Sequence, residues 1–297
     1  MENCIVFGGL GFIGSNLVKK LNLKFKTYVF ANSKYSKKSR NSFNYNYRNF
    51  KKKIKKINPK IIFFLSGNSY PNNSLNLNLY DIKRSNIIIQ DFLYALANIK
   101  FKGTVIYTSS IAVYGNDKFN NHKFVSENSN LNPKNFYGLS KVIAEEQFKF
   151  FNKNYKIKVF ILRLSSVFGL NLNKQVIFDL IQGIKSKKKK FLVLNGKKTD
   201  SRQFVYINDL VNILIKLTNL KKNYLLLNIS NGKKYKIIKI AKAIMKILKI
   251  NKKIIFLNKP SPEFPILKNK LLKKNLNYKI NFSNFNSSLK ETVNYWK

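Results

Sequence analysis

Residues 4–16 read Cys-Ile-Val-Phe-Gly-Gly-Leu-Gly-Phe-Ile-Gly-Ser-Asn, an apolar run followed by a segment rich in glycine. The run has the length and composition of a buried strand, and an apolar pattern typical of a helix begins at the last glycine. Gly9, Gly11 and Gly14 satisfy G-x-G-x-x-G, in which glycines permit a tight turn and let backbone N–H groups approach a pyrophosphate. The helix N-terminus adds unpaired N–H groups. The stretch therefore predicts a dinucleotide site with contacts from Gly8, Gly11, Phe12, Ile13 and Gly14.

The composition is that of a globular protein. The chain has 297 residues, 44% of them hydrophobic, which exceeds a typical single domain of ~100–200 residues. No apolar run reaches the ~18 residues of a membrane span, and the first strand begins too close to Met1 for a signal peptide. Cys4 is the only cysteine, so no internal disulfide can form. We expect a cytoplasmic protein in a reducing compartment, with no membrane partner and no metal site.

The formal net charge of +45 admits two interpretations. Taken alone, it is typical of a protein that binds nucleic acid or an anionic membrane. However, only five of the 57 basic residues are arginine, and lysine accompanies an excess of asparagine, isoleucine, phenylalanine and tyrosine, all encoded by A/T-rich codons. Nucleic-acid recognition favours arginine for bidentate contacts. We therefore attribute the charge to codon bias, expect no nucleic-acid partner, and expect anionic substrates to be attracted.

Strand-like and helix-like segments alternate over the first half of the chain. Strands are expected at 4–7, 27–31, 61–65, 104–108 and 157–162, and helices at 14–22, 49–57, 85–98 and 137–152. This alternation predicts an α/β fold with a doubly wound, Rossmann-like parallel sheet. After residue 165 the segments become shorter and irregular. We predict a dinucleotide-binding domain over 1–165 and a smaller, mainly substrate-binding region over 166–297, with about 203–220 returning to the first domain.

Tyr137 and Lys141 are four residues apart in a predicted helix and so share one face. An ammonium next to a phenol favours the phenolate, so we expect the pKa of Tyr137 to fall toward neutrality and suit a general acid/base. The alternative is an exposed pair in a lysine-rich chain. Ser110 follows the fourth predicted strand, at the sheet edge where doubly wound folds bind ligands, and can hydrogen-bond the same substrate oxygen. The alternative for Ser110 is a capping turn before Gly115.

At these residues the chain resembles the extended short-chain dehydrogenase/reductases, specifically the NAD-dependent nucleotide-sugar epimerase/dehydratase family. The resemblance spans essentially the whole chain and follows the family's order of motifs. The further motifs are Ser-Ile-Ala-Val-Tyr-Gly at 110–115, Arg163-Leu-Ser-Ser-Val-Phe-Gly169, Arg202-Gln-Phe-Val-Tyr-Ile-Asn-Asp209, Asn228-Ile-Ser-Asn-Gly232 and Leu289-Lys-Glu-Thr-Val-Asn-Tyr-Trp296. The resemblance implies hydride transfer between a sugar carbon and a nicotinamide cofactor.

The resemblance also implies roles for individual residues. Tyr137 would be the acid/base that moves the hydroxyl proton, and Ser110 would polarise the sugar oxygen. Lys141 would hold the nicotinamide ribose and lower the pKa of the tyrosine. Asn86 would help to position the cofactor and the neighbouring helix.

Two further expectations concern binding partners. Arg202 resembles the residue that grips the diphosphate of the sugar nucleotide, a task suited to a bidentate guanidinium. The alternative for Arg202 is a surface ion pair with Asp200 or Asp209. Relatives commonly dimerise through helices that correspond to 85–98 and 137–152, so the resemblance implies a homodimer.

The chain departs from the family's cofactor pattern after the second strand. The family usually places an acidic residue there, on the adenine ribose. Here Asn32 stands at the end of the strand, and no carboxylate occurs between Glu2 and Asp81. Asn46 replaces the family's aspartate near the adenine. The basic residues that follow the strand would tolerate a 2′-phosphate: Lys34, Lys37, Lys38 and Arg40. We expect NAD or NADP, with a slight preference for NADP.

Other departures narrow the chemistry. The 4,6-dehydratases carry an Asp-Glu pair directly after the catalytic hydroxyl residue, and decarboxylating relatives need the glutamate, whereas this chain has Ile111 and Ala112. Relatives that epimerise at two carbons use a cysteine and a histidine, but Cys4 lies in the first strand. The sequence therefore predicts a nucleotide-sugar 4-epimerase or 4-ketoreductase. The alternatives are an oxidoreductase of the same fold acting on a non-sugar carbonyl, and a non-catalytic binder of cofactor or nucleic acid.

Overall fold

The computed structural model describes residues 1–31, 42–44, 47–67, 86–115, 124–188, 190–259, 264–278 and 280–297. Several residues of the cofactor prediction lie outside the described residues: Asn32, Lys34, Lys37, Lys38, Arg40, Asn46 and Asp81.

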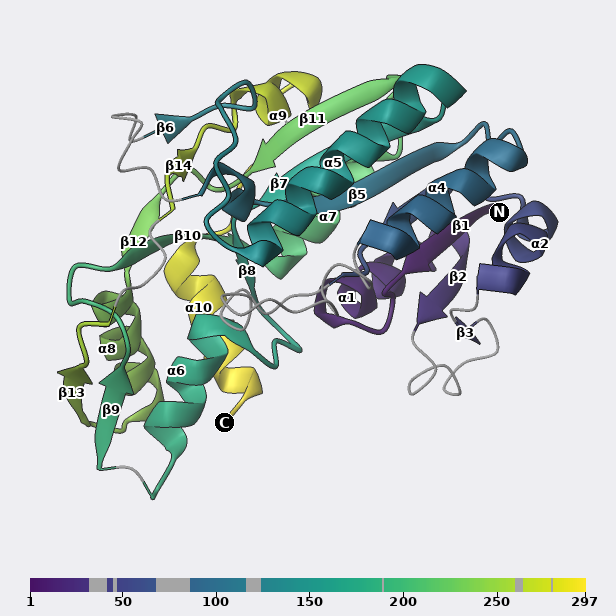
Figure 1. The fold of residues 1–297 in the computed structure, drawn as a ribbon. Helices are drawn as coiled ribbons and strands as arrows, with labels where there is room; N and C mark the ends of the chain where they lie inside the picture. Colours follow the sequence, from purple (N-terminus) through teal and green to yellow (C-terminus); the bar gives the residue numbers. More distant parts are fainter. Residues whose placement is uncertain are drawn as a thin grey trace.

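The described residues form a central, seven-stranded parallel sheet in the order β11-β7-β5-β4-β1-β2-β3 (Figure 1). Its strands are β1 (Glu2–Phe7), β2 (Phe25–Ala31), β3 (Ser42–Asn44), β4 (Ile61–Phe64), β5 (Thr104–Ser110), β7 (Lys158–Leu164) and β11 (Tyr224–Ile229). β2 and β4 lie on opposite sides of β1, so the strand order reverses there. In doubly wound sheets this reversal opens a ligand crevice at the carboxyl ends of the strands.

Helices cover both faces of this sheet, which explains why its strands are continuous apolar runs. One face carries α1 (Phe12–Leu21) and α7 (Ile207–Leu217). The other face carries α2 (Tyr47–Ile57), α4 (Ile88–Asn98) and α5 (Phe136–Tyr155). The second core is rich in aromatic rings, and Phe7 stacks on Phe30 and Phe64 at centroid distances of 4.9 and 5.2 Å. The structure confirms the predicted α/β fold and its doubly wound sheet.

The segments after β7 form small sheets and further helices. They are β8 (Ser166–Phe168), α6 (Gln175–Lys185), β9 (Phe191–Leu194), β10 (Ser201–Tyr206), β12 (Lys234–Lys236), α8 (Ile237–Leu248), β13 (Lys253–Phe256), β14 (Ile266–Leu267), α9 (Lys270–Asn275) and α10 (Phe285–Tyr295). β12, β10 and β8 form one sheet, β13 pairs with β9, and β14 pairs with β6 (Phe124–Val125). Two elements from this half return to the central sheet: α7 packs against α1, and β11 pairs with β7. The sequence analysis did not predict β11, and its domain division at residue 165 stays a prediction.

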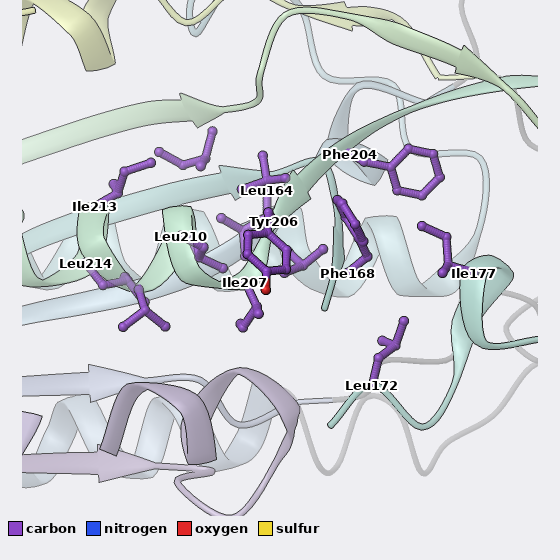
Figure 2. Close-up of a cluster of buried hydrophobic side chains, with 14 of the residues drawn as sticks. Leu164, Phe168, Leu172, Ile177, Phe204, Tyr206, Ile207, Leu210, Ile213 and Leu214 are labelled. Carbon is purple, nitrogen blue, oxygen red and sulfur yellow. The ribbon is translucent and has the colours of Figure 1, made fainter. Parts of the chain in front are cut away.

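One hydrophobic cluster joins the central sheet to the C-terminal segments. Figure 2 labels ten of its buried side chains: Leu164, Phe168, Leu172, Ile177, Phe204, Tyr206, Ile207, Leu210, Ile213 and Leu214. They come from β7, β8, α6, β10, α7 and the segment before α6, and the same cluster reaches Val6 of β1 and Leu17 of α1. Burying a large apolar side chain contributes about 1.5–3 kcal/mol. The cluster therefore fixes β10, which carries Arg202, against the sheet.

The described helices include none that is both long enough and apolar enough to cross a membrane.

Candidate active site

The turn between β1 and α1 leaves little room for side chains at its glycines. Gly8 has φ +75°, and a Cβ atom on Gly14 would lie 2.2 Å from the Gly8 carbonyl oxygen. Gly11 caps α1 without a side-chain hydrogen bond, so no side chain takes the first N–H groups of the helix. A bare turn that leads into an uncapped helix N-terminus fits the pyrophosphate of a dinucleotide. The predicted contacts at Gly8, Gly11, Phe12, Ile13 and Gly14 all lie in this turn and the first turn of α1.

The end of β4 connects this glycine turn to Lys141. A Cβ atom on Gly8 would lie 3.1 Å from the backbone nitrogen of Ser66, so the two turns are in close contact. Gly67 has φ +151°, and its Cβ position is 3.4 Å from Lys141 Nζ. The sequence analysis missed Ser66 and Gly67. Their position directly after a strand could have identified them, because ligands bind at the carboxyl ends of parallel strands.

The N-terminus of α5 brings Tyr137 to Ser110. Asn135 caps the helix by accepting a 2.8 Å hydrogen bond from the Gly138 N–H. A Cβ atom on Gly138 would lie 2.6 Å from the Ala112 carbonyl oxygen, so α5 packs directly on the short 3₁₀ helix η4 (Ile111–Tyr114). This contact places the Tyr137 hydroxyl in a hydrogen bond with Ser110. Ser110 also caps η4, so the capping alternative describes a second role of the same hydroxyl.

Lys141 is buried, with only 6% of its surface exposed, and so is not the exposed residue of the alternative interpretation. Its Nζ donates a 3.0 Å hydrogen bond to the Thr108 carbonyl oxygen and lies 5.0 Å from the centroid of the Tyr107 ring. Burial lowers the pKa of Lys141 to about 8, and the charge of Glu145 opposes that shift.

The expected lowering of the Tyr137 pKa is wrong for this structure. Burial raises the pKa of Tyr137 above its ordinary value, and the hydrogen bond with Ser110 only partly offsets this. Lys141 Nζ lies 5.9 Å from the centroid of the Tyr137 ring and is bonded to Thr108 instead. Desolvation therefore sets the direction of the pKa shift of Tyr137.

A buried polar network lies behind Lys141. Glu145 accepts hydrogen bonds from Arg163 Nε at 3.0 Å and Nη2 at 2.7 Å, and a third from Ser109 Oγ. Arg163 Nη1 also donates to Tyr114 Oη at 2.8 Å, which in turn donates to Asn228 Oδ1 at 2.7 Å. The network joins α5, β5, β7, η4 and β11. The sequence analysis noted Arg163 and Asn228 as motif residues without a role, and it missed Glu145.

Asn86 is a buried residue whose side-chain amide is unsatisfied. Both polar atoms of its side chain lack a hydrogen-bond partner in the described part of the chain. A buried polar group left unpaired costs about 1–3 kcal/mol, so such a group is suited to bind a ligand. This fits the role that the resemblance gives to Asn86.

Arg202 lies half-buried in β10, in register with Tyr235 of β12. Burial lowers its pKa, while the charges of Asp200 and Asp179 raise it. Asp209 is engaged elsewhere, because its carboxylate accepts hydrogen bonds from the N–H and hydroxyl of Ser283. Of the two aspartates considered as partners of Arg202, only Asp200 therefore raises the pKa of its guanidinium.

Comparison with known proteins places the whole arrangement in context. The model of the NAD dependent epimerase/dehydratase family matches residues 4–230. A dTDP-D-glucose 4,6-dehydratase from Dictyostelium discoideum is 26% identical over 244 residues, which cover 71% of this chain but only 54% of that protein. An ADP-L-glycero-D-manno-heptose-6-epimerase from Brachyspira hyodysenteriae is 26% identical over 266 residues, 82% of this chain and 81% of that protein.

A similar solved structure is UDP-N-acetylglucosamine 4-epimerase from Methanobrevibacter ruminantium M1 in complex with UDP-N-acetylmuramic acid. Its TM-score is 0.86 at 23% identity, and the match covers 99% of this chain and 98% of that one. At this identity the likeness shows a shared fold.

Proposed function

The chain belongs to the NAD-dependent epimerase/dehydratase family, and from this premise we propose that it is an NAD(P)-dependent nucleotide-sugar epimerase or 4-ketoreductase. The observation that carries the proposal is the meeting of four features at one edge of the sheet. They are the bare glycine turn after β1, Gly67 after β4, Ser110 at the end of β5, and the Tyr137–Lys141 pair on α5. This is the edge at which doubly wound folds bind ligands.

We assign the chemistry as follows. The glycine turn, Asn86 and Lys141 would hold the dinucleotide, whose nicotinamide supplies or accepts the hydride when bound. Ser110 would hydrogen-bond the reacting sugar oxygen, and Tyr137 Oη would give it a proton or take one from it. Because burial raises the pKa of Tyr137, the residue is a phenol at neutral pH and ready to act as the acid toward a keto group.

The residues after Ser110 support redox chemistry at one carbon. Ile111 and Ala112 are buried and apolar, so η4 offers no carboxyl group at these positions for the elimination of water. We further propose that residues 1–165 bind the dinucleotide and that 166–297 mainly hold the substrate, with its diphosphate on Arg202. The slight preference for NADP rests on Asn32 and its basic neighbours, so it stays a prediction.

The first experiment is mass spectrometry of the small molecule released when freshly purified protein is denatured. Stoichiometric NAD would favour an epimerase, because such an enzyme returns the hydride it takes. NADP or an empty protein would favour the reductase, with a 4-keto sugar nucleotide as the first substrate. Failure to bind either nicotinamide cofactor, together with no turnover of any nucleotide sugar, would contradict the proposal. Turnover of simple carbonyls alone, or binding without turnover, would instead support one of the two alternatives.

We also propose that two copies of the chain associate through α4 and α5. These neighbouring helices, with the N-cap residue of α4, carry large apolar side chains that are exposed in the single chain: Ile87, Tyr94, Leu139, Ile143 and Phe150. Figure 1 shows α4 and α5 side by side on one face of the sheet. An exposed apolar surface of this kind is typical of a protein interface.

Ile143→Glu is expected to convert the dimer to a monomer, because it would bury a charge at the centre of the proposed interface. Light scattering coupled to size-exclusion chromatography would read the mass directly. Leu23→Glu is the matched control, because Leu23 is also apolar and exposed but lies in the turn before β2. An unchanged mass for Ile143→Glu would place the interface elsewhere.

A further inference from the structure

We propose that Glu145, held in place by Arg163, is a positioning residue that keeps Lys141 charged for the reaction. This inference rests on the proposed function, and it adds a third residue to the Tyr137–Lys141 pair. Glu145 belongs to no motif that the sequence analysis identified.

Tyr137, Lys141 and Glu145 are spaced by four residues along α5 and so lie on one face of the helix. That face packs against β5 and β7. Glu145 has no exposed surface, whereas its neighbour Glu146 has 59% of its side chain exposed and pairs with Lys149 on the surface. The chain therefore places two glutamates side by side, one facing the site and one facing solvent.

The carboxylate of Glu145 is fixed from two strands. Arg163 of β7 donates from Nε and Nη2 to its two oxygens, and Ser109 of β5 donates a third hydrogen bond. Ser109 adjoins Ser110 and Thr108, whose carbonyl oxygen accepts the hydrogen bond from Lys141. The same short stretch of β5 therefore holds Glu145, Lys141 and the Tyr137 hydroxyl. Such charge-assisted bonds fix the position of the carboxylate.

Among the residues that the structure describes, few other charges surround Lys141. The groups that face it are Tyr137 and Glu145 on α5, the Tyr107 ring and the Thr108 carbonyl on β5, and Gly67 after β4. Arg163 of β7 forms an ion pair with Glu145, and its Nη1 donates hydrogen bonds to Tyr114 Oη and to the backbone carbonyl oxygen of Glu127. The charges of both Glu145 and Arg163 act on Tyr224 of β11. Glu145 is the group that raises the pKa of Lys141 against burial, which lowers it to about 8. Without this carboxylate, a larger share of Lys141 would be neutral at physiological pH.

A purely structural role for the Glu145–Arg163 pair is the competing explanation, because removing one member of a buried pair strands the other charge. Glu145→Gln alone cannot separate the two, since it leaves Arg163 without its counter-charge. The double variant E145Q/R163Q removes both charges and keeps amides that can hydrogen-bond each other. Glu145→Asp keeps the charge, and Glu146→Gln is the matched control on the solvent-facing side of the same helix.

Two measurements are compared between pH 6 and pH 10: the dissociation constant for the nicotinamide cofactor by calorimetry, and turnover of the identified substrate. We expect the alkaline limb of both profiles to move to lower pH by about one unit in E145Q/R163Q. At pH values below that limb, the cofactor dissociation constant and the turnover of the double variant should stay within a few-fold of the wild-type values. Glu145→Asp should keep the wild-type limb, and so should the Glu146→Gln control.

A folded double variant that keeps the wild-type alkaline limb would overturn the inference. An equal loss of cofactor affinity and turnover at every pH would overturn it as well. The pKa of Lys141 in the cofactor-free protein gives an independent reading by competitive acetylation and peptide mass spectrometry. The inference requires this pKa to be lower in E145Q/R163Q than in the wild type, and an equal pKa would overturn it. A wild-type protein that binds no nicotinamide cofactor would instead contradict the proposed function.

Discussion

Tyr137→Phe is expected to lower kcat by at least about two to four orders of magnitude while leaving the fold and the cofactor affinity nearly unchanged. The substitution removes one hydroxyl, the group proposed to move the proton, and general acid/base groups typically contribute 10²–10⁴-fold to a rate. The ring stays in place because α5 is fixed by the Asn135 cap and by the close contact of Gly138 with Ala112. Steady-state turnover, calorimetry with the cofactor and thermal unfolding measure the three quantities.

The control for this prediction is Tyr155→Phe. Tyr155 is the last residue of the same helix and is exposed, and its ring stacks on Phe151. Removing its hydroxyl should change neither turnover nor cofactor affinity. If Tyr137→Phe kept the wild-type rate on the true substrate, another group would have to move the proton, and the proposed mechanism would be wrong.

The fold could be predicted from the sequence because the sheet is buried on both faces. Its first strands are therefore apolar runs separated by helical patterns, as at 61–65 and 104–108. β11 (Tyr224–Ile229) was missed although it is equally apolar, because it follows a segment of the chain that lacks this alternation. Its partner β7 lies more than sixty residues earlier, and the pairing is set by the core of Figure 2 rather than by any local pattern.

The site could be predicted only where one element or one sheet edge fixes the geometry. The spacing on α5 relates Tyr137 to Lys141, and the strand end locates Ser110. The contact of Glu145 with Arg163 joins a helix to a strand, so spacing alone does not reveal it. The direction of the Tyr137 pKa depends on burial, which the sequence does not give, and this is why the expectation from the neighbouring ammonium was wrong.

Lys141→Met is expected to abolish turnover, weaken cofactor binding and yet stabilise the fold at pH 7. Burial lowers the pKa of Lys141 from 10.5 to about 8, and each pKa unit corresponds to about 1.4 kcal/mol. The loss of its hydrogen bond to Thr108 costs about 0.5–1.5 kcal/mol in the other direction. The free energy of unfolding should therefore rise by about 2–3 kcal/mol, as measured by urea denaturation.

The pH dependence of this gain identifies its cause. Below pH 8 both the folded and the unfolded chain hold the Lys141 proton, so the wild type bears the full cost of the buried charge. Between pH 8 and 10.5 the unfolded chain holds more protons than the folded one, so wild-type stability from this group rises with pH and the advantage of methionine shrinks. Lys153→Met, an exposed position on α5, should show no such dependence. A stability gain that is constant from pH 6 to pH 10 would come from better packing of methionine, and a buried charge at Lys141 would then not be the destabilising feature.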